Sequence, residues 1–177
     1  MAADEGWRVH LQTLTADFRH MTASWDSSAA GVWRAALPRL LVQGRFRSVA
    51  LYRLSSAVEA RGWRALALWL QSRGQRATGA EIHPAATIGP GLKLAHGGGV
   101  VVGHEVVAGV DLILYQSVTL GHGPAGAGQP TVGDRVRIFA GAVVLGPINI
   151  GDDAVIGANA VVLADVPAAA VATGVWK

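Results

Sequence analysis

The sequence predicts a mainly β fold, a parallel β-helix of six-residue repeats preceded by an α-helical segment. Three observations support it: composition changes near Gly79, an aliphatic residue recurs at every sixth position after it, and helical spacing precedes it. Of the 23 Gly, 5 lie in residues 1–78 and 18 in residues 79–177. Positions 1–80 carry a net charge of +6, whereas positions 81–177 carry a net charge of −3. We therefore expect a helical segment over residues 1–78 and a β-helix domain over residues 79–177.

The first segment favours helices because Leu, Val, Trp and Ala recur at helical spacing in residues 33–76, with Arg on the opposite side. Pro38 suits a helix start, whereas Gly62 and Gly74 suit helix ends. Residues 1–30 predict a weaker helix followed by a loop. We expect a helical cap or an oligomerisation element. The alternative is an Arg-rich amphipathic surface that lies on a membrane.

The second segment has an aliphatic residue at every sixth position, in two phased runs separated by a Gly-rich stretch. A period of six fits neither an amphipathic helix nor simple strand alternation. Short strands followed by corners give one inward anchor per side, and three sides close a coil of about 18 residues. Such coils stack through parallel pairing at about 4.8 Å, and Gly, Asn and Asp suit their corners. The predicted anchors are Ile82, Ile88, Leu94, Val100, Val106, Leu112, Val118, Val132, Ile138, Val144, Ile150, Ile156 and Val162.

Residues that are 18 apart on such a coil lie above one another. Ala140 and Ala158 form one such pair, and His104 and His122 form another if the chain is still in the coil at His122. Residues 121–131 are too irregular to stay on the wall, so they predict a protruding loop whose turns are set by Gly and Pro. Because long loops on compact scaffolds are usually functional, we expect this one to be functional too.

The composition excludes several classes of protein. The absence of Cys excludes a disulfide framework, a thiolate metal site and a Cys nucleophile. No run of about 18 apolar residues is present, which argues against a spanning helix, and the first residues do not resemble a secretory signal. The basic residues lie among Trp and Leu without a nucleic-acid reader motif. We expect a cytoplasmic protein that binds neither a membrane nor nucleic acid.

Four His of the second segment are candidates for chemistry: His83, His96, His104 and His122. A His suits the role of a general base that takes a proton from a hydroxyl group, because its ring titrates near neutral pH. His96 stands in LAHGGGVVVG, where three Gly leave the backbone open to a ligand. His83 stands in EIHP at the junction of the two segments, where a structural role is expected. His96 is therefore the candidate base.

Several longer motifs go beyond the six-residue repeat. IHPAA, IGPG, YQSVTLG, VVLGPI and IGANAVVLADVP, with LYRL in the helical segment, cover roughly residues 37–175. In this combination the chain resembles the serine O-acetyltransferase family of hexapeptide-repeat acyltransferases, in a short form. The resemblance implies a left-handed β-helix and transfer of an acetyl group from acetyl-CoA to L-serine in cysteine biosynthesis. It also implies a trimer, or a dimer of trimers, with active sites between neighbouring subunits, and no metal.

The resemblance assigns roles to individual residues. His96 matches the general base, and backbone N–H groups of the Gly-rich walls would meet the oxyanion. In the family, CoA lies along an edge of the coil. The positions that match its cofactor contacts are Gly121, His122, Ala140, Gly141 and Ala158. The spacing of 18 between two of these positions independently favours one groove along stacked coils.

Some positions depart from the family pattern. Ala95 replaces the Asp that orients the base, and Gln129 replaces a His that helps to bind serine. An N-terminal acid contacts the amino group of serine in the family, and Asp26 is the candidate for it here. His104 replaces the Glu of the VVGE motif and is followed by Glu105. Either of these two side chains could orient the base; a substrate carboxylate or a neighbouring subunit is the alternative.

Three alternative functions stay open. An O-acetyltransferase can act on a sugar or natural-product hydroxyl group, and a catalytically degenerate homologue can serve as a scaffold or regulatory subunit. A γ-type carbonic anhydrase would hold zinc through three His, for which His96, His104 and His122 are candidates, but the spacing and motifs do not match that family. The terminal GVWK lacks the tail with which some family members dock into cysteine synthase, so that complex is not expected.

Overall fold

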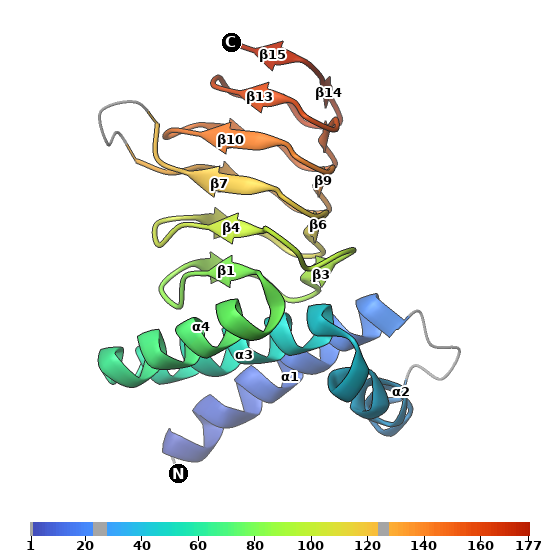
Figure 1. Cartoon of the computed structure of the whole chain (residues 1–177), viewed down its shortest axis with the longest axis vertical. Helices are drawn as coiled ribbons and strands as arrows, with labels where there is room; N and C mark the ends of the chain where they lie inside the picture. The colour runs from blue at the N-terminus through green and yellow to red at the C-terminus, as the bar shows by residue number, and fades with distance from the viewer. Residues whose placement is uncertain (1, 23–27, 124–127) are drawn as a thin grey trace.

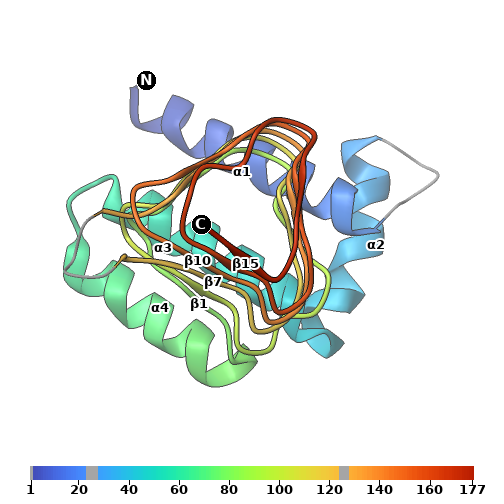
Figure 2. The same cartoon turned by 90° about the horizontal axis from the view of Figure 1, so that it is seen from above.

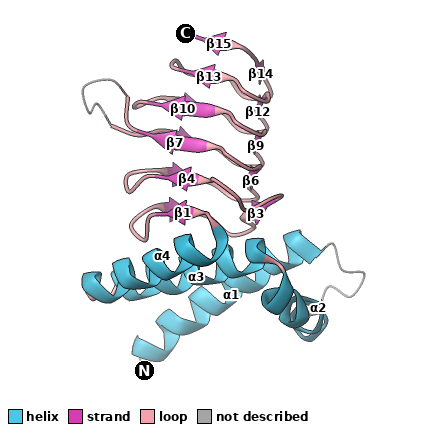
Figure 3. Ribbon diagram, in the orientation of Figure 1, coloured by secondary structure: helices cyan, strands magenta, loops and turns pink. Residues whose placement is uncertain are grey.

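The structure, a computed structural model, describes residues 2–22, 28–123 and 128–177, with side chains from residue 7 onward. Four helices form the base of the molecule and a solenoid of parallel strands rises from it (Figure 1), so that helices and strands occupy separate halves (Figure 3). The described part of the chain contains no helix that is both long and apolar enough to cross a membrane. The helices are α1 (Ala2–Thr22), α2 (Ala29–Val42), α3 (Gly44–Glu59) and α4 (Arg64–Thr78).

Two helix boundaries differ from the sequence prediction. Pro38 lies inside α2 rather than at a helix start, and Gly74 lies inside α4 rather than at its end. A Cβ on Gly74 would lie 3.5 Å from the Leu51 side chain, so this small residue lets α3 and α4 pack closely. α4 ends instead at Gly79, whose φ of 74° is a left-handed cap that Gly adopts without strain. Gly62, with a φ of 79°, lies in the turn between α3 and α4, as predicted.

The second half of the chain forms three parallel sheets of six, four and five short strands in the described ranges. Viewed along the axis, successive coils superpose as a triangle (Figure 2). The predicted parallel β-helix with an N-terminal helical segment is therefore confirmed. The strands are β1 (Glu81–Ile82), β2 (Thr87–Ile88), β3 (Lys93–Leu94), β4 (Val101–Val102), β5 (Val107–Ala108), β6 (Ile113–Leu114), β7 (Thr119–Gly121), β8 (Thr131–Val132), β9 (Arg137–Ile138), β10 (Val143–Leu145), β11 (Asn149–Ile150), β12 (Val155–Ile156), β13 (Val161–Val162), β14 (Val171–Ala172) and β15 (Val175–Trp176).

Three corners connect the sheets of each coil. The loop corner leads from the sheet of β1, β4 and β7 to the sheet of β2, β5 and β8, and its turns include those after β4 and β7. The ladder corner leads from there to the sheet of β3, β6 and β9, and its turns include those after β5, β8 and β11. The His96 corner closes the triangle, with turns after β3, β6, β9 and β12. Side chains on one corner stack along the axis.

The repeat changes phase at the His96 corner of the first coil. Glu81 pairs with Val101 at a sequence spacing of 20, whereas Val101 pairs with Thr119 at a spacing of 18. Two additional residues therefore lie between β3 and β4, and four of the predicted anchors were wrong in phase although right in period. These four residues are buried at the corners, two residues ahead of the strand positions: Val100, Val106, Leu112 and Val118. The inward strand residues are Val102, Ala108, Leu114 and Leu120.

The interior of the solenoid is a column of aliphatic side chains. Leu94, Leu114, Ile138 and Ile156 occupy the same position on successive coils and are fully buried. Burial of each such side chain contributes about 1.5–3 kcal/mol. Because pairing and packing recur in every coil, the outward side chains of neighbouring coils stand at a regular separation of about 4.8 Å.

A buried ion pair joins the helical base to the first coil. Asp17 of α1 accepts hydrogen bonds from Arg53 Nε (2.7 Å) and Nη2 (3.0 Å), and from the N–H groups of Gly91 and Leu92. Arg53 also donates to two carbonyl oxygens of the same coil. Burial raises the pKa of the Asp17 carboxyl, and the hydrogen bonds oppose that rise. Removing one partner would leave an unpaired buried charge at a cost of about 3–5 kcal/mol, so the base is fixed beneath the coil.

Candidate active site

His96 is an exposed side chain in the turn between β3 and β4, where the two additional residues lie. Its ring centroid is 6.4 Å from that of Tyr115, and Tyr115 stacks on Phe139 at 4.7 Å. Three rings from three successive coils thus follow one another along the His96 corner. Within the described ranges, the His96 side chain makes no hydrogen bond and no ion pair. Its ring nitrogens are therefore available to a ligand.

A cleft of about 500 Å³ opens beside His96, between the turn and the start of α3. Arg45 crosses this cleft, where its Nη1 donates to the carbonyl oxygen of Ala95 at 3.2 Å. A Cβ on Gly97 would lie 3.4 Å from the Cα of Arg45, so Gly permits this close approach. The charged group next to His96 is thus a cation rather than a carboxylate. The cleft is lined by Gln43, Gly44, Arg45, Thr78, Ala95, His96, Gly97 and Gly98.

Small residues lie on the same corner, farther along the axis. The N–H of Asn159 donates to the carbonyl oxygen of Ala140 at 2.9 Å, and the strands on either side of this turn pair at a sequence spacing of 18. This confirms the predicted stacking of Ala158 on Ala140. Gly141 has a φ of 70°, and a Cβ there would overlap the side-chain oxygen of Asn159. The three small residues leave a strip of open wall along the corner.

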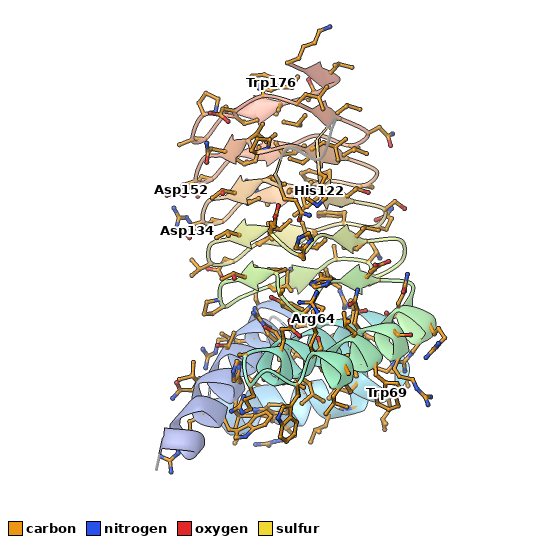
Figure 4. The ribbon with its side chains drawn as sticks, turned by 90° about the vertical axis from the view of Figure 1, so that its left-hand side faces the viewer. Arg64, Trp69, His122, Asp134, Asp152 and Trp176 are labelled. Carbon is orange, nitrogen blue, oxygen red and sulfur yellow. The ribbon has the colours of Figure 1, made fainter. Side chains whose placement is uncertain are left out.

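A second group of polar residues gathers at the loop corner, the face on which Figure 4 labels His122. His104 and His122 stand on successive coils with ring centroids 5.4 Å apart, which confirms their predicted stacking. Glu105 Oε1 lies 3.6 Å from His104 Nε2, and Oε2 lies 4.0 Å from His122 Nδ1. Gln129 Oε1 accepts a hydrogen bond from the N–H of Glu105 (3.1 Å), and its Nε2 lies 3.4 Å from His104 Nδ1.

His83 extends this histidine column to the first coil. Its ring centroid lies 5.5 Å from that of His104. Its Nδ1 accepts a hydrogen bond from the N–H of Ala85 at 3.1 Å, within its own turn. Burial, together with the neighbouring His104, lowers the pKa of His83. A ring that is neutral and bonded to its own turn agrees with the structural role that the sequence favours.

The ladder corner has charged residues of a different kind. Arg135 donates to both carboxylate oxygens of Asp153 at 2.8 Å. Asp134 and Asp152 lie one above the other (Figure 4), and each accepts a hydrogen bond from a backbone N–H of the preceding coil at 2.9 Å. A cleft of about 520 Å³ lies here too, but Nδ1 of its histidine, His20, is bonded to a backbone carbonyl oxygen at 2.7 Å. These side chains connect neighbouring coils.

Comparison with known proteins identifies the family. Residues 129–164 match the family model described as bacterial transferase hexapeptide (six repeats). A serine acetyltransferase of Helicobacter pylori (strain ATCC 700392 / 26695) is 42% identical over 151 residues, which cover 84% of this chain and 86% of that protein. The chain belongs to the serine acetyltransferase family.

Solved structures of serine acetyltransferases share the fold. The Neisseria gonorrhoeae serine acetyltransferase in complex with serine has a TM-score of 0.79 and 32% identity, and the match covers 94% of this chain and 70% of that chain. A serine acetyltransferase in complex with CoA has a TM-score of 0.81 and 34% identity, with 97% and 71% covered. This chain therefore spans about two thirds of the length of the solved family members that it matches.

The positions that match the family's site residues fall into two groups. No contact joins His104 or Glu105 to His96 within the described part of one chain. The His96 corner also does not meet His122, so the described part of one chain does not assemble the three-histidine zinc site considered as an alternative. Asp26 lies outside the described residues. The His96 corner holds His96, Ala140, Gly141 and Ala158, and the loop corner holds Gly121, His122, Gln129, His104 and Glu105.

Three residues beside His96 were missed by the sequence prediction: Arg45, Tyr115 and Phe139. The strands that precede the two rings pair at a spacing of 24, because the loop after β7 separates them in the sequence. Removing residues 121–131 from the count would have revealed this pair. Arg45 reaches the cleft only through the packing of α3 on the first coil, and this packing leaves no periodic signal in the sequence.

Proposed function

We propose that this chain transfers an acetyl group from acetyl-CoA to the hydroxyl group of L-serine, with His96 as general base. The observation that carries the proposal is the His96 corner: an exposed imidazole without a hydrogen-bond partner in the described ranges stands beside an open cleft. Membership of the serine acetyltransferase family supports this donor and acceptor. One solved relative is described in complex with serine and another in complex with CoA.

In the proposed step, a ring nitrogen of His96 takes the proton of the substrate hydroxyl group while the hydroxyl oxygen attacks the thioester carbonyl carbon. The tetrahedral intermediate carries a negative charge on the former carbonyl oxygen, which backbone N–H groups of the Gly-rich turn can stabilise. Collapse of the intermediate breaks the C–S bond, and His96 returns the proton to the sulfur. The products are the O-acetyl ester and free CoA.

The surroundings of His96 suit both substrates. The strip of small residues formed by Ala140, Gly141 and Ala158 lets an extended pantetheine arm lie against the wall. Arg45 supplies a cation in the cleft, and a guanidinium binds a carboxylate such as that of L-serine through charge-assisted hydrogen bonds. In this proposal residues 1–78 are a helical base that places Arg45, and residues 79–177 are the acyltransferase domain with its loop at residues 121–131.

The division of matched positions between two corners favours a trimer. One chain carries the base at one corner and the positions matched to serine recognition at another, so each corner is half of a different site. A neighbouring chain that sets its loop corner against the His96 corner would complete the site, and three chains around an axis make three sites. Exposed apolar helix residues such as Leu41, Trp63 and Trp69 suit a further contact that joins two trimers. Light scattering tests this, and a monomeric mass would contradict it.

A second candidate function is acetylation of a hydroxyl group other than that of serine. Ala95 leaves His96 without an orienting carboxylate, and Gln129 is held by the backbone of Glu105 beside His104. These are positions that the family resemblance links to serine binding and base orientation. Their side chains favour an altered acceptor site, such as one for a sugar or natural-product hydroxyl group. Loss of activity altogether, with a scaffold role, is the third possibility.

An acceptor panel separates these functions. Release of free CoA from acetyl-CoA is measured with L-serine, simple sugars and aliphatic alcohols under identical conditions. We expect turnover with L-serine to exceed that with every other acceptor. Turnover with a sugar or an alcohol but not with L-serine would change the acceptor. Binding of acetyl-CoA without turnover of any acceptor would favour the scaffold role.

A further inference from the structure

The loop corner carries three side chains whose ligand atoms converge. One atom from each of His104, Glu105 and His122 lies within 4.8 Å of the others. His104 Nε2 is 3.6 Å from Glu105 Oε1, and His122 Nδ1 is 4.0 Å from Glu105 Oε2. All three side chains are exposed. An ion in the solvent therefore has direct access to them, and the side chains can adjust around it.

The chemistry of this group is that of a metal site. Two imidazoles and a carboxylate are typical ligands of Zn²⁺ and of Co²⁺. Such ions bind these atoms at about 2.0–2.2 Å, which places neighbouring ligand atoms of a tetrahedral site about 3.3–3.5 Å apart. The observed separations of 3.6 Å and 4.0 Å are only slightly larger. Small rotations of exposed side chains close the difference.

The backbone fixes the relative positions of the two histidines. His104 follows β4 and His122 follows β7, and these strands pair in register at Val102 and Leu120. The two rings therefore stand on adjacent strands of a repeated sheet, with centroids 5.4 Å apart. The backbone of Glu105 is held by Gln129 Oε1. Ion binding thus requires little additional ordering of the chain, as in sites built on rigid elements.

We propose that His104, Glu105 and His122 bind one divalent transition-metal ion per chain, with Zn²⁺ as the representative ion and water at its open positions. This goes beyond the proposed acetyl transfer, and it differs from the absence of metal that the family resemblance implies. A second His–carboxylate pair, His20 with Asp111 at 3.5 Å, offers a single imidazole, so it serves as the control.

Gln129 offers a way to tune this site. Its Nε2 faces His104 Nδ1, which favours the tautomer with a proton on Nε2, whereas a metal on Nε2 needs the proton on Nδ1. Gln129→Glu supplies one carboxylate oxygen that accepts this proton and a second that keeps the bond from the N–H of Glu105. Partners of this kind change metal affinity by about 10–100-fold. We expect Gln129→Glu to tighten binding on the order of tenfold.

Cobalt and zinc ions are the probes for the test. The untagged full chain is freed of metal with a chelator, Co²⁺ is titrated while visible absorption is recorded, and Zn²⁺ is then added as competitor. We expect saturation at one Co²⁺ per chain for the wild type and for His20→Ala. The double variant His104→Ala/His122→Ala should bind on the order of 100-fold more weakly or not at all, because two of three ligands are gone.

The outcomes are decisive in both directions. Saturable binding by the wild type that the double variant lacks supports the site. An absence of saturable binding by the wild type, or equal affinity in the double variant, overturns it. The substituted side chains are exposed, and circular dichroism checks the fold of each variant; Glu105→Gln keeps the side-chain size and serves as a second test. Neither acetyl-CoA nor an acceptor is present, so the result is independent of the proposed acetyl transfer.

Discussion

The His96 corner and the loop corner of this β-helix differ in how their polar side chains are partnered. At the first, His96 has no hydrogen-bond partner in the described ranges and stands beside stacked rings and an open cleft. At the second, His104, Glu105, His122 and Gln129 lie against one another. Both corners come from the same repeat and stand on strands of the same coils. The side chains placed on the corners, rather than the backbone, make the difference.

The contrast separates two kinds of task. An imidazole without a partner keeps a lone pair free for the proton of an incoming hydroxyl group. Groups that contact one another hold charges and ligand atoms in a set arrangement, which suits recognition or ion binding. The ladder corner shows a third task, because its Arg135–Asp153 pair connects one coil to the next. A repeated triangle thus distributes chemistry, recognition and stability over its three edges.

The largest expected effect that would test this contrast comes from His96→Ala. Removing the unpartnered imidazole should lower kcat for acetyl transfer about 10²–10⁴-fold, which is the usual contribution of a general base, while KM for acetyl-CoA changes little. Release of free CoA measures it, and His20→Ala at the ladder corner is the control that stays active. A His96→Ala protein with kcat within about threefold of the wild type would exclude His96 as the base.

Mixed oligomers sharpen the same prediction. His96→Ala keeps an intact loop corner, and the double variant His104→Ala/Gln129→Ala keeps an intact His96 corner. If neighbouring chains complete each site, a co-expressed mixture should be more active than either parent, because some interfaces then combine two intact corners. A mixture that is no more active than its parents would place both contributions within one chain.

The six-residue period was sufficient to predict the parallel β-helix, because each side of each coil buries an aliphatic side chain. It was not sufficient to predict the register. Val100 and Val102 are both buried, so a run of three Val satisfies either phase, and Ala108 is too small to be recognised as an anchor. Strand pairing alone reveals the two residues that are inserted before Val101.

The candidate site was predictable only where the signal was local. The three Gly beside His96 marked the open turn, and the spacing of 18 predicted that His104 stacks on His122. The split of the site between two corners requires the number of sides between these residues, which depends on the register. The contact of Arg45 with the first coil depends on how a helix packs, which no spacing along the chain encodes.

A smaller effect is expected from giving His96 a partner of the kind found at the loop corner. Ala95→Asp places a carboxylate next to His96 in a cleft that has none among the described residues, where it can orient the imidazole and stabilise its protonated form. We expect kcat with L-serine to rise on the order of tenfold, measured by release of free CoA. Ala95→Asn has the same size without the charge and should give no gain. Equal gains in the two variants would contradict the electrostatic explanation.

A still smaller effect is expected from blocking the strip of small residues. Ala158→Leu adds bulk to an exposed position above Ala140, where the pantetheine arm is proposed to lie. Loss of this contact surface should raise KM for acetyl-CoA on the order of fivefold with kcat less affected. Steady-state kinetics at varied acetyl-CoA measures it. Ala168→Leu, an exposed Ala at the ladder corner, is the matched control, and an equal rise in KM there would remove the groove from the proposal.

The smallest expected effect comes from Arg135→Ala at the ladder corner. The variant loses a charge pair whose two side chains are largely exposed, and such pairs contribute little to stability. We expect Tm to fall by no more than about 4 °C at pH 7, as measured by calorimetry. The Arg135 guanidinium lowers the pKa of Asp153, so the contribution of the pair is present above the unfolded-state pKa of Asp, near 3.9, and is lost as the pH falls through the lower folded-state value.

Two readouts of Arg135→Ala therefore define the ladder corner. The difference in Tm between the variant and the wild type should shrink on acidification below pH 4, because the Asp153 carboxylate that pairs with Arg135 becomes protonated. Acetyl transfer at pH 7 should be unchanged, since Arg135 stands on the edge of the triangle that carries neither His96 nor the loop-corner group. A fall in kcat without a fall in Tm would give the ladder corner a catalytic role, and the assignment of one task to each edge would then be wrong.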